Sequence, residues 1–208
     1  MTDFGLAKKS VIITGGAGGL GRAFAQGFLD AGAYVAIADV NEAGAQSVAN
    51  AFGAKDKQCI GCAVDVTDET SIARMAERAR EAFGGVDILI NNAAIYGALT
   101  RKPFFEITAE EWDRVLSVNL KGAFLCAKAV YPHMKSRGGK IVNIASASAM
   151  SGSPLWLLRV VKGRLDRDDS RPGSRARRSR CDGQRGCPGI HADRREPQGG
   201  RQCRDVER

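Results

Sequence analysis

The sequence lacks the features that would place it outside the cell or in a membrane. The first ten residues, MTDFGLAKKS, contain no apolar segment of the kind that a secretory signal needs. No apolar run approaches the roughly 20 residues of a membrane-spanning helix. The six cysteines have no spacing typical of a disulfide framework. We therefore expect a reduced, cytoplasmic protein that makes no membrane contact.

Two of the cysteines, Cys59 and Cys62, form a C-x-x-C pattern inside a predicted strand. Residues three apart in a strand point to opposite faces of a sheet, so these two thiols should not meet at one ion. We interpret them as two small buried side chains and predict no metal site.

Large apolar side chains are scarce in the last 50 residues, 159–208. This segment has 15 Lys and Arg against 8 Asp and Glu, a net charge of +7, whereas residues 1–158 have 16 against 15, a net of +1. Burial of so little apolar surface cannot offset the entropy cost of ordering the chain. The sequence thus predicts one folded domain at 1–158 and a basic, disordered tail at 159–208.

Short apolar runs alternate with helical patterns through the first 146 residues. The predicted strands are 10–16, 34–40, 59–67, 86–94 and 140–146, and the predicted helices are 20–32, 41–53, 69–85 and 108–139. Asp68 can cap the third helix, and Thr108 and Glu111 have the spacing of a capping box. This alternation predicts an α/β fold of the Rossmann type, a doubly wound parallel sheet that ends after its fifth strand.

A glycine-rich turn joins the first predicted strand to the first helix. Its sequence, TGGAGGLGR (14–22), fits the pattern T-G-x-x-x-G-x-G. Small residues at this place let the backbone turn sharply and approach a pyrophosphate at the helix N-terminus. The turn therefore predicts a dinucleotide site.

Asp39 ends the second predicted strand. An acid at this position accepts hydrogen bonds from the adenosine ribose hydroxyls and repels a 2′-phosphate, which favours NAD over NADP. Asp39 could also cap the helix that begins near Asn41, and both roles are compatible.

Four further motifs follow in order along the chain. DVTD (65–68) comes after the third strand and NNAA (91–94) after the fourth, VNLKG (118–122) lies in the long helix, and IVNIASAS (141–148) closes the fifth strand. Together with the glycine turn, these motifs resemble the short-chain dehydrogenases/reductases over residues 7–158. Ala94 departs from the family's usual glycine.

The resemblance implies reversible oxidation of a secondary alcohol to a ketone, with a small-molecule substrate and homo-oligomeric intact relatives. Asn119 would help to form a proton relay, although it could simply kink a helix. Ser146 would polarise the substrate oxygen, although it could be one of the serines of SASAMS. The implied NAD contacts are Gly15, Gly19, Leu20 and Gly21 at the pyrophosphate, Asp39 and Val40 at the adenosine ribose, Asp65 and Val66 at adenine, and Asn92 and Ala93 at the neighbouring ribose.

The family's reaction needs a tyrosine acid/base and a lysine four residues after it. The motif spacing puts this pair at Arg159 and Gly163, and neither residue can supply that chemistry. Tyr131 and Lys135 have the required spacing, but they precede Ser146 and the fifth strand, so we interpret them as the end of an amphipathic helix. The chain as written is expected to be inactive.

A shifted reading frame would explain the missing pair. If the gene is read one base later from codon 158, permitted codons convert Leu158–Gly163 to Tyr-Ala-Ser-Ser-Lys-Gly, followed by an amphipathic helix and the family's sixth strand. With two deleted bases restored, this tyrosine falls at position 159, 13 residues after Ser146. A two-base deletion near codons 157–159 has this effect, so we expect the tail to be an out-of-frame translation that ends at a chance stop codon. With the catalytic helix lost, we expect Leu120, Phe124 and Val130 to be exposed.

Two other functions remain open from the sequence. A folded but inactive protein would bind NAD without turnover. A nucleic-acid binder would use the basic stretch RPGSRARRSR (171–180), but that stretch has no interleaved aromatic residues and no folded platform, so we expect no nucleic-acid partner.

Overall fold

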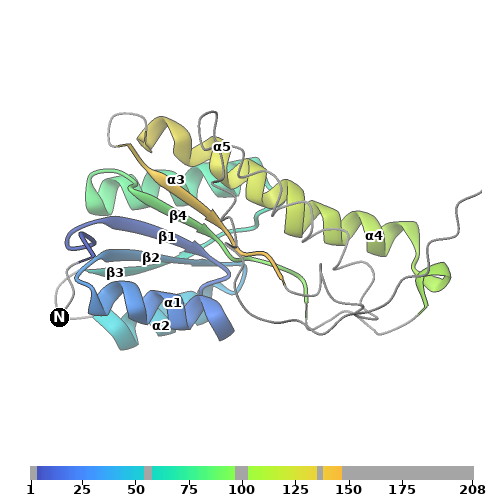
Figure 1. Cartoon of the computed structure of the whole chain (residues 1–208), viewed down its shortest axis with the longest axis horizontal. Coiled ribbons are helices and arrows are strands. Elements are labelled where there is room, and N and C mark those ends of the chain that lie inside the picture. Colours follow the sequence, from blue (N-terminus) through green and yellow to red (C-terminus); the bar gives the residue numbers. More distant parts are fainter. Residues whose placement is uncertain (1–3, 54–57, 97–102, 135–137, 147–208) are drawn as a thin grey trace, which may run out of the picture. The chain divides into compact units, whose positions relative to one another are not determined.

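A computed structural model describes residues 4–53, 58–96, 103–134 and 138–146 (Figure 1). Five strands alternate with helices along these residues, as the sequence predicts. The strands are β1 (Ser10–Thr14), β2 (Tyr34–Asp39), β3 (Cys59–Ala63), β4 (Ile88–Asn91) and β5 (Lys140–Asn143). The helices are α1 (Gly19–Asp30), α2 (Glu42–Gly53), α3 (Glu69–Phe83), α4 (Ala109–Leu116) and α5 (Gly122–Met134), with a 3₁₀ turn at Phe104–Glu106 and a π-helical turn at Ser117–Lys121.

The described strands form one parallel sheet in the order β3-β2-β1-β4-β5. β1 lies in the middle, with Val11 paired to Val35 of β2 on one side and to Ile88 of β4 on the other. The chain moves outward from β1 to β3 and then crosses to β4, so the strand order reverses beside β1. Ligands of doubly wound sheets bind at the carboxyl ends of the strands at this reversal point. The predicted fold class is confirmed.

Alternation along the strands divides the apolar side chains between two cores. Val11 and Ile13 pack with α1 and α2, whereas Ile12 packs with α3 and α5. Figure 1 shows these two pairs of helices on opposite faces of the sheet. All three side chains are fully buried, and each contributes roughly 1.5–3 kcal/mol. A parallel sheet covered on both faces accounts for the continuous apolar runs in the sequence.

Cys59 and Cys62 lie on opposite faces of β3, as predicted. Cys59 packs in the α1/α2 core and Cys62 in the α3/α5 core. Burial raises the pKa of the Cys59 thiol to about 12 and that of the Cys62 thiol to about 11, so both are neutral thiols at physiological pH. Within the described ranges, His, Cys, Asp and Glu form no group of three that could hold a metal ion.

The helix starts follow the predicted capping residues. The Asp68 side chain accepts a hydrogen bond from the Thr70 N–H at the start of α3. Thr108 and Glu111 form the predicted capping box at the start of α4. Among the helices that the structure describes, none is both long and apolar enough to span a bilayer.

The single helix predicted at 108–139 is divided in the structure. The π-helical turn Ser117–Lys121 separates α4 from α5, and α5 ends at Met134. The Gly122 N–H donates to the Ser117 carbonyl, a bond that spans five residues. Such a turn inserts one extra residue. The side chains of α5 are therefore rotated by about 100° from the positions they would have in an uninterrupted helix that continues α4.

The prediction of an exposed face on this helix is only partly correct. Phe124 is 66% exposed, but Leu120 is half-buried beside Val115, and Val130 is fully buried in the α3/α5 core. Six residues of α-helix turn through about 600°, so Val130 lies about 120° around the helix from Phe124. Tyr131 is closer in angle to Phe124 and is 59% exposed.

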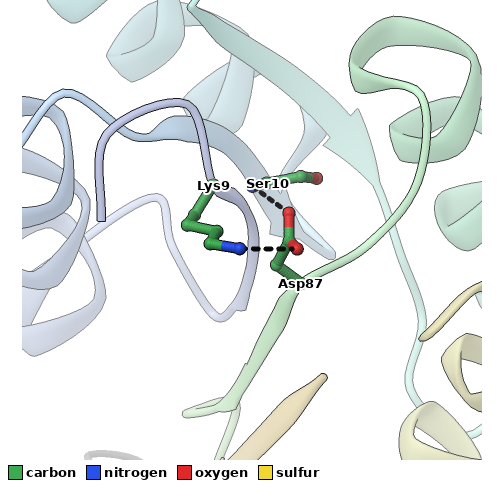
Figure 2. A network of polar contacts seen from close by, with 3 residues as sticks. All are labelled: Lys9, Ser10 and Asp87. Carbon is green, nitrogen blue, oxygen red and sulfur yellow. Dashed lines mark hydrogen bonds and ion pairs between the residues drawn. The ribbon is translucent and has the colours of Figure 1, made fainter. Parts of the chain in front are cut away.

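Asp87, which precedes β4, joins the amino ends of three strands. Its carboxylate accepts a hydrogen bond from the Ser10 N–H at 2.9 Å and lies 3.5 Å from Lys9 Nζ (Figure 2). Its backbone N–H donates to the Ser10 carbonyl at 2.9 Å, and its own carbonyl accepts from the Lys140 N–H at 2.8 Å. β1, β4 and β5 are thereby held together at the edge opposite their carboxyl ends.

The close packing of α1 predicts opposite effects for two glycine-to-alanine changes in that helix. A methyl group at Gly21 would press on the Gly15 carbonyl oxygen and lie 2.8 Å from Asn92 Nδ2, so Gly21→Ala should cost roughly 1–3 kcal/mol of stability. A methyl group at Gly27 would meet none of the described atoms within 4 Å outside its own helix backbone, so Gly27→Ala should stabilise the chain by about 0.5–1 kcal/mol through helix propensity. Thermal denaturation followed by circular dichroism measures both changes in stability. Equal melting temperatures of the two variants would contradict the close packing at Gly21.

Candidate functional site

The glycine turn lies at the carboxyl end of β1, where the strand order reverses. Gly15 and Gly19 have left-handed φ values of +65° and +51°, which other residues adopt at a cost. Gly21 is buried against Gly15, whereas Gly18, Gly19 and Leu20 are exposed. The turn therefore packs on the protein at its two ends and faces open space in its middle.

The amino end of α1 is available to an anion. Its N-cap residue, Gly18, has extended backbone and contributes no side-chain hydrogen bond, and the first turn carries no acidic residue. Backbone N–H groups at such a helix end point outward with the positive end of the helix dipole. This geometry suits a phosphate group and fits the predicted pyrophosphate contact of the turn.

Thr14 and Asn92 join the carboxyl ends of β1 and β4. Thr14 Oγ1 accepts hydrogen bonds from the backbone N–H groups of Asn92 and Ala93, each at 3.1 Å. Asn92 Nδ2 donates to the carbonyls of Thr14 and Gly15 at 3.0 and 2.9 Å. The Asn92 amide therefore holds the glycine turn, and a direct contact of Asn92 with a cofactor ribose stays a prediction.

The Asp39 carboxylate contacts two turns at once. Asp39 Oδ2 accepts from the Ala17 N–H at 3.0 Å, and Asp39 Oδ1 accepts from the Asn41 N–H at 3.0 Å. Helix α2 is capped by Asn41, whose Oδ1 accepts from the Gly44 N–H at 3.0 Å. The alternative role of Asp39 as the cap of that helix is therefore wrong, because Asn41 fills it.

Asp65 and Val66 follow β3 at the same edge of the sheet. Asp65 Oδ1 accepts from the Thr67 N–H at 2.8 Å and from Thr67 Oγ1 at 2.7 Å. These bonds hold the pKa of the Asp65 carboxyl below its ordinary value, so the exposed side chain is a carboxylate acceptor at neutral pH. Val66 is buried and packs closely on Gly122 at the start of α5.

A cavity of about 730 Å³ joins these features, within the range typical of cofactor sites. The predicted residues that line it are Gly15, Asp39, Val40, Asp65, Val66, Asn92 and Ala93. Gly19, Leu20 and Gly21 lie in the same turn but outside this lining. Sequence reasoning missed Gly18, Val64, Thr67, Ala94, Ile95, Arg114, Ser117 and Val118, which also line it. Four of these residues lie within the quoted motifs and three adjoin them, whereas Arg114 had no signal in the sequence.

Asn119 lies in the π-helical turn and is 1% exposed. Its Oδ1 accepts from the Ile95 N–H at 2.7 Å, and its Nδ2 donates to the Ile95 carbonyl at 3.2 Å. Because Ile95 lines the cavity, Asn119 fixes one cavity wall. Asn119 also lies in the π-helical turn that interrupts the regular helix, which is close to the alternative prediction that it kinks a helix.

The residues predicted for the chemical step are not gathered at this cavity. Ser146 is half-buried after β5 and is not among the lining residues. Tyr131 is exposed in the last turn of α5 and is not among the lining residues, which agrees with its interpretation as part of a helix end. Lys135, Arg159 and Gly163 lie outside the described residues.

Comparison with known proteins gives matches over the same region. The sequence profile described as short chain dehydrogenase matches residues 9–158. Sorbitol dehydrogenase from Cereibacter sphaeroides is 40% identical over 149 residues, which cover 71% of this chain and 56% of that protein. Galactitol 2-dehydrogenase from Agrobacterium fabrum is 43% identical over 155 residues, which cover 74% of this chain and 58% of that protein. The chain thus spans just over half the length of these relatives.

A solved structure agrees with these sequence matches. The 3-ketoacyl-(acyl-carrier-protein) reductase from Brucella melitensis, crystallised with NADH, superposes with a TM-score of 0.72 at 34% identity, covering 77% of this chain and 66% of that one. The profile, the relatives and the shared parallel sheet all lead to one assignment. The chain belongs to the short-chain dehydrogenase family.

Proposed function

We propose that this sequence derives from an NAD-dependent oxidoreductase that interconverts a secondary alcohol and a ketone. One observation carries the proposal: the same cavity adjoins the uncapped amino end of α1 and is lined by the carboxylates of Asp39, at the end of β2, and Asp65, just after β3. A dinucleotide has a pyrophosphate between two nucleosides, so it presents an anion to the helix end and hydrogen-bond donors to the carboxylates. The NADH named for the Brucella melitensis structure supports this assignment.

Each part of the cavity would hold a different part of the cofactor. The glycine turn, with Gly15, Gly19, Leu20 and Gly21, would bind the pyrophosphate through backbone N–H groups. Asp39 and Val40 would contact the adenosine ribose, Asp65 and Val66 the adenine, and Asn92 and Ala93 the neighbouring ribose. The nicotinamide supplies hydride acceptance or donation when it is bound.

The charge of Asp39 favours NAD over NADP in this proposal. Asp39 is half-buried and lines the cavity, and its two oxygens already accept backbone N–H groups. Each oxygen keeps a lone pair for a ribose hydroxyl. A 2′-phosphate at the same place would meet a like charge instead.

The catalytic set of this chain is incomplete in our proposal. Ser146 would polarise the substrate oxygen, and Asn119 would support a proton relay while it holds the wall at Ile95. The tyrosine and lysine that the reaction needs are absent from positions 159 and 163, and we attribute this to a shifted reading frame after codon 157. The end of the family match at residue 158 supports that explanation.

The substrate of the ancestral enzyme would be a small alcohol or ketone. The names of the sorbitol and galactitol dehydrogenases make polyols reasonable first candidates. We also propose a reducing compartment such as the cytoplasm, because Cys59, Cys62 and Cys126 are free thiols buried in the cores.

Cofactor preference tests the first part of this proposal. Isothermal titration of the 208-residue chain should show tighter binding of NAD than of NADP, because a like charge at Asp39 costs on the order of 1–3 kcal/mol, about 5- to 150-fold in affinity. The Asp39→Ala change should reduce the difference between the affinities for NAD and NADP. Tighter binding of NADP by the unaltered chain would overturn the assignment.

Activity tests the second part. Loss of a positioned acid/base costs about 10²–10⁴-fold in rate, so the chain as written should give no measurable NADH absorbance with sorbitol, galactitol or simple secondary alcohols. A gene repaired by two bases near codon 158 should regain the Tyr-x-x-x-Lys pair and turnover together. Robust turnover by the unrepaired chain, abolished by Tyr131→Phe, would instead assign the reaction to Tyr131 and Lys135.

A further inference from the structure

The Asp39 carboxylate is itself held in a fixed position at the edge of the sheet. The Asp39 carbonyl accepts a hydrogen bond from the Val64 N–H at 2.9 Å, and Asp39 pairs with Ala63 of β3. On its other side β2 pairs with β1 as far as Ala38 and Thr14. A side chain on such a backbone is a rigid support for whatever it contacts.

What Asp39 contacts is the middle of the glycine turn. Ala17 lies between Gly16 and Gly18, and its N–H donates to Asp39 Oδ2 at 3.0 Å. Gly16 is held by its own N–H, which donates to the Ala38 carbonyl at 3.1 Å. Among the described residues, no other side chain bonds to residues 16–19, and Gly18 and Gly19 have open space where a Cβ would lie. The Asp39 bond is thus the side-chain anchor of the middle of the turn, whereas Asn92 holds its start at Thr14 and Gly15.

We propose that Asp39 positions the glycine turn for the pyrophosphate, in addition to contacting the adenosine ribose. This inference rests on the proposed NAD site. The carboxylate links the two parts of that site: one oxygen holds the turn over which the pyrophosphate lies, and the other holds the turn into α2. A turn that is already ordered binds its ligand more tightly, because less conformational entropy is lost on binding.

A positioning role for Asp39 predicts a different result from a role limited to recognising ribose hydroxyls. If Asp39 only recognised hydroxyls, its substitution would not change the affinity for a nucleotide that lacks them. If Asp39 positions the turn, the affinity for such a nucleotide falls as well, because the amides that bind the diphosphate lose their support.

The test uses the 208-residue chain and 2′,3′-dideoxy-ADP, which has the diphosphate and adenine but neither hydroxyl. Asp39→Asn and Asp39→Ala both remove the charge, but the asparagine keeps an oxygen that can accept from the Ala17 N–H. We expect Asp39→Ala to bind this nucleotide about 3- to 10-fold more weakly than Asp39→Asn, the size of one net hydrogen bond. Amide exchange of Ala17, measured by NMR without nucleotide, should be faster in Asp39→Ala than in Asp39→Asn.

Asp65→Asn is the matched control, because Asp65 lines the same cavity and makes no bond to the turn. It should leave Ala17 exchange unchanged. Equal dideoxy-ADP affinities and equal Ala17 exchange in the two Asp39 variants would overturn the positioning role. Failure of the unaltered chain to bind NAD would instead contradict the proposed function, and the exchange measurement would still decide whether Asp39 holds the turn.

Discussion

The contact between helix α1 and the glycine turn leaves no room for a side chain at Gly21, and the rest of the site depends on that contact. A methyl group at Gly21 would also lie 2.8 Å from Asn92 Nδ2, which donates to the Gly15 carbonyl from the end of β4. Helix, turn and β4 therefore form one packed junction. Backbone N–H groups bind an anion best where the backbone is fixed, so in the proposed NAD site this junction would determine where the pyrophosphate lies.

Much of the fold could be predicted because its causes are local. Apolar runs between helical patterns identified the strands, and the Asp68 and Thr108 caps form as their spacing indicates. The π-helical turn at Ser117–Lys121 could not be predicted, because the bonds that Asn119 makes from this turn go to Ile95, 24 residues earlier in the chain. Tertiary contacts of this kind leave no periodic signal in a sequence.

The candidate site was predictable to the extent that motifs mark strand ends. The glycine turn, Asp39 and Asp65 converge because parallel strands bring their carboxyl ends to one edge. The separate roles of the site residues were not predictable, because motif spacing cannot show that the Asn92 amide donates to the Gly15 carbonyl. It also could not show that Asn41, rather than Asp39, caps α2 and leaves Asp39 to the turn.

In the proposed function, nucleotide binding and turnover would depend on different parts of this sequence. The cavity is built from the ends of β1–β4 and the α4–α5 junction, and both faces of the sheet beneath it are covered by helices. The described residues of that arrangement all precede residue 147. At β5, however, Ile141 and Val142 are 36% and 43% exposed, and the last 50 residues contain only five large apolar side chains with which to cover them. In the function proposed above, such a chain would bind the cofactor through its first four strands and would lack the tyrosine and lysine that move a proton.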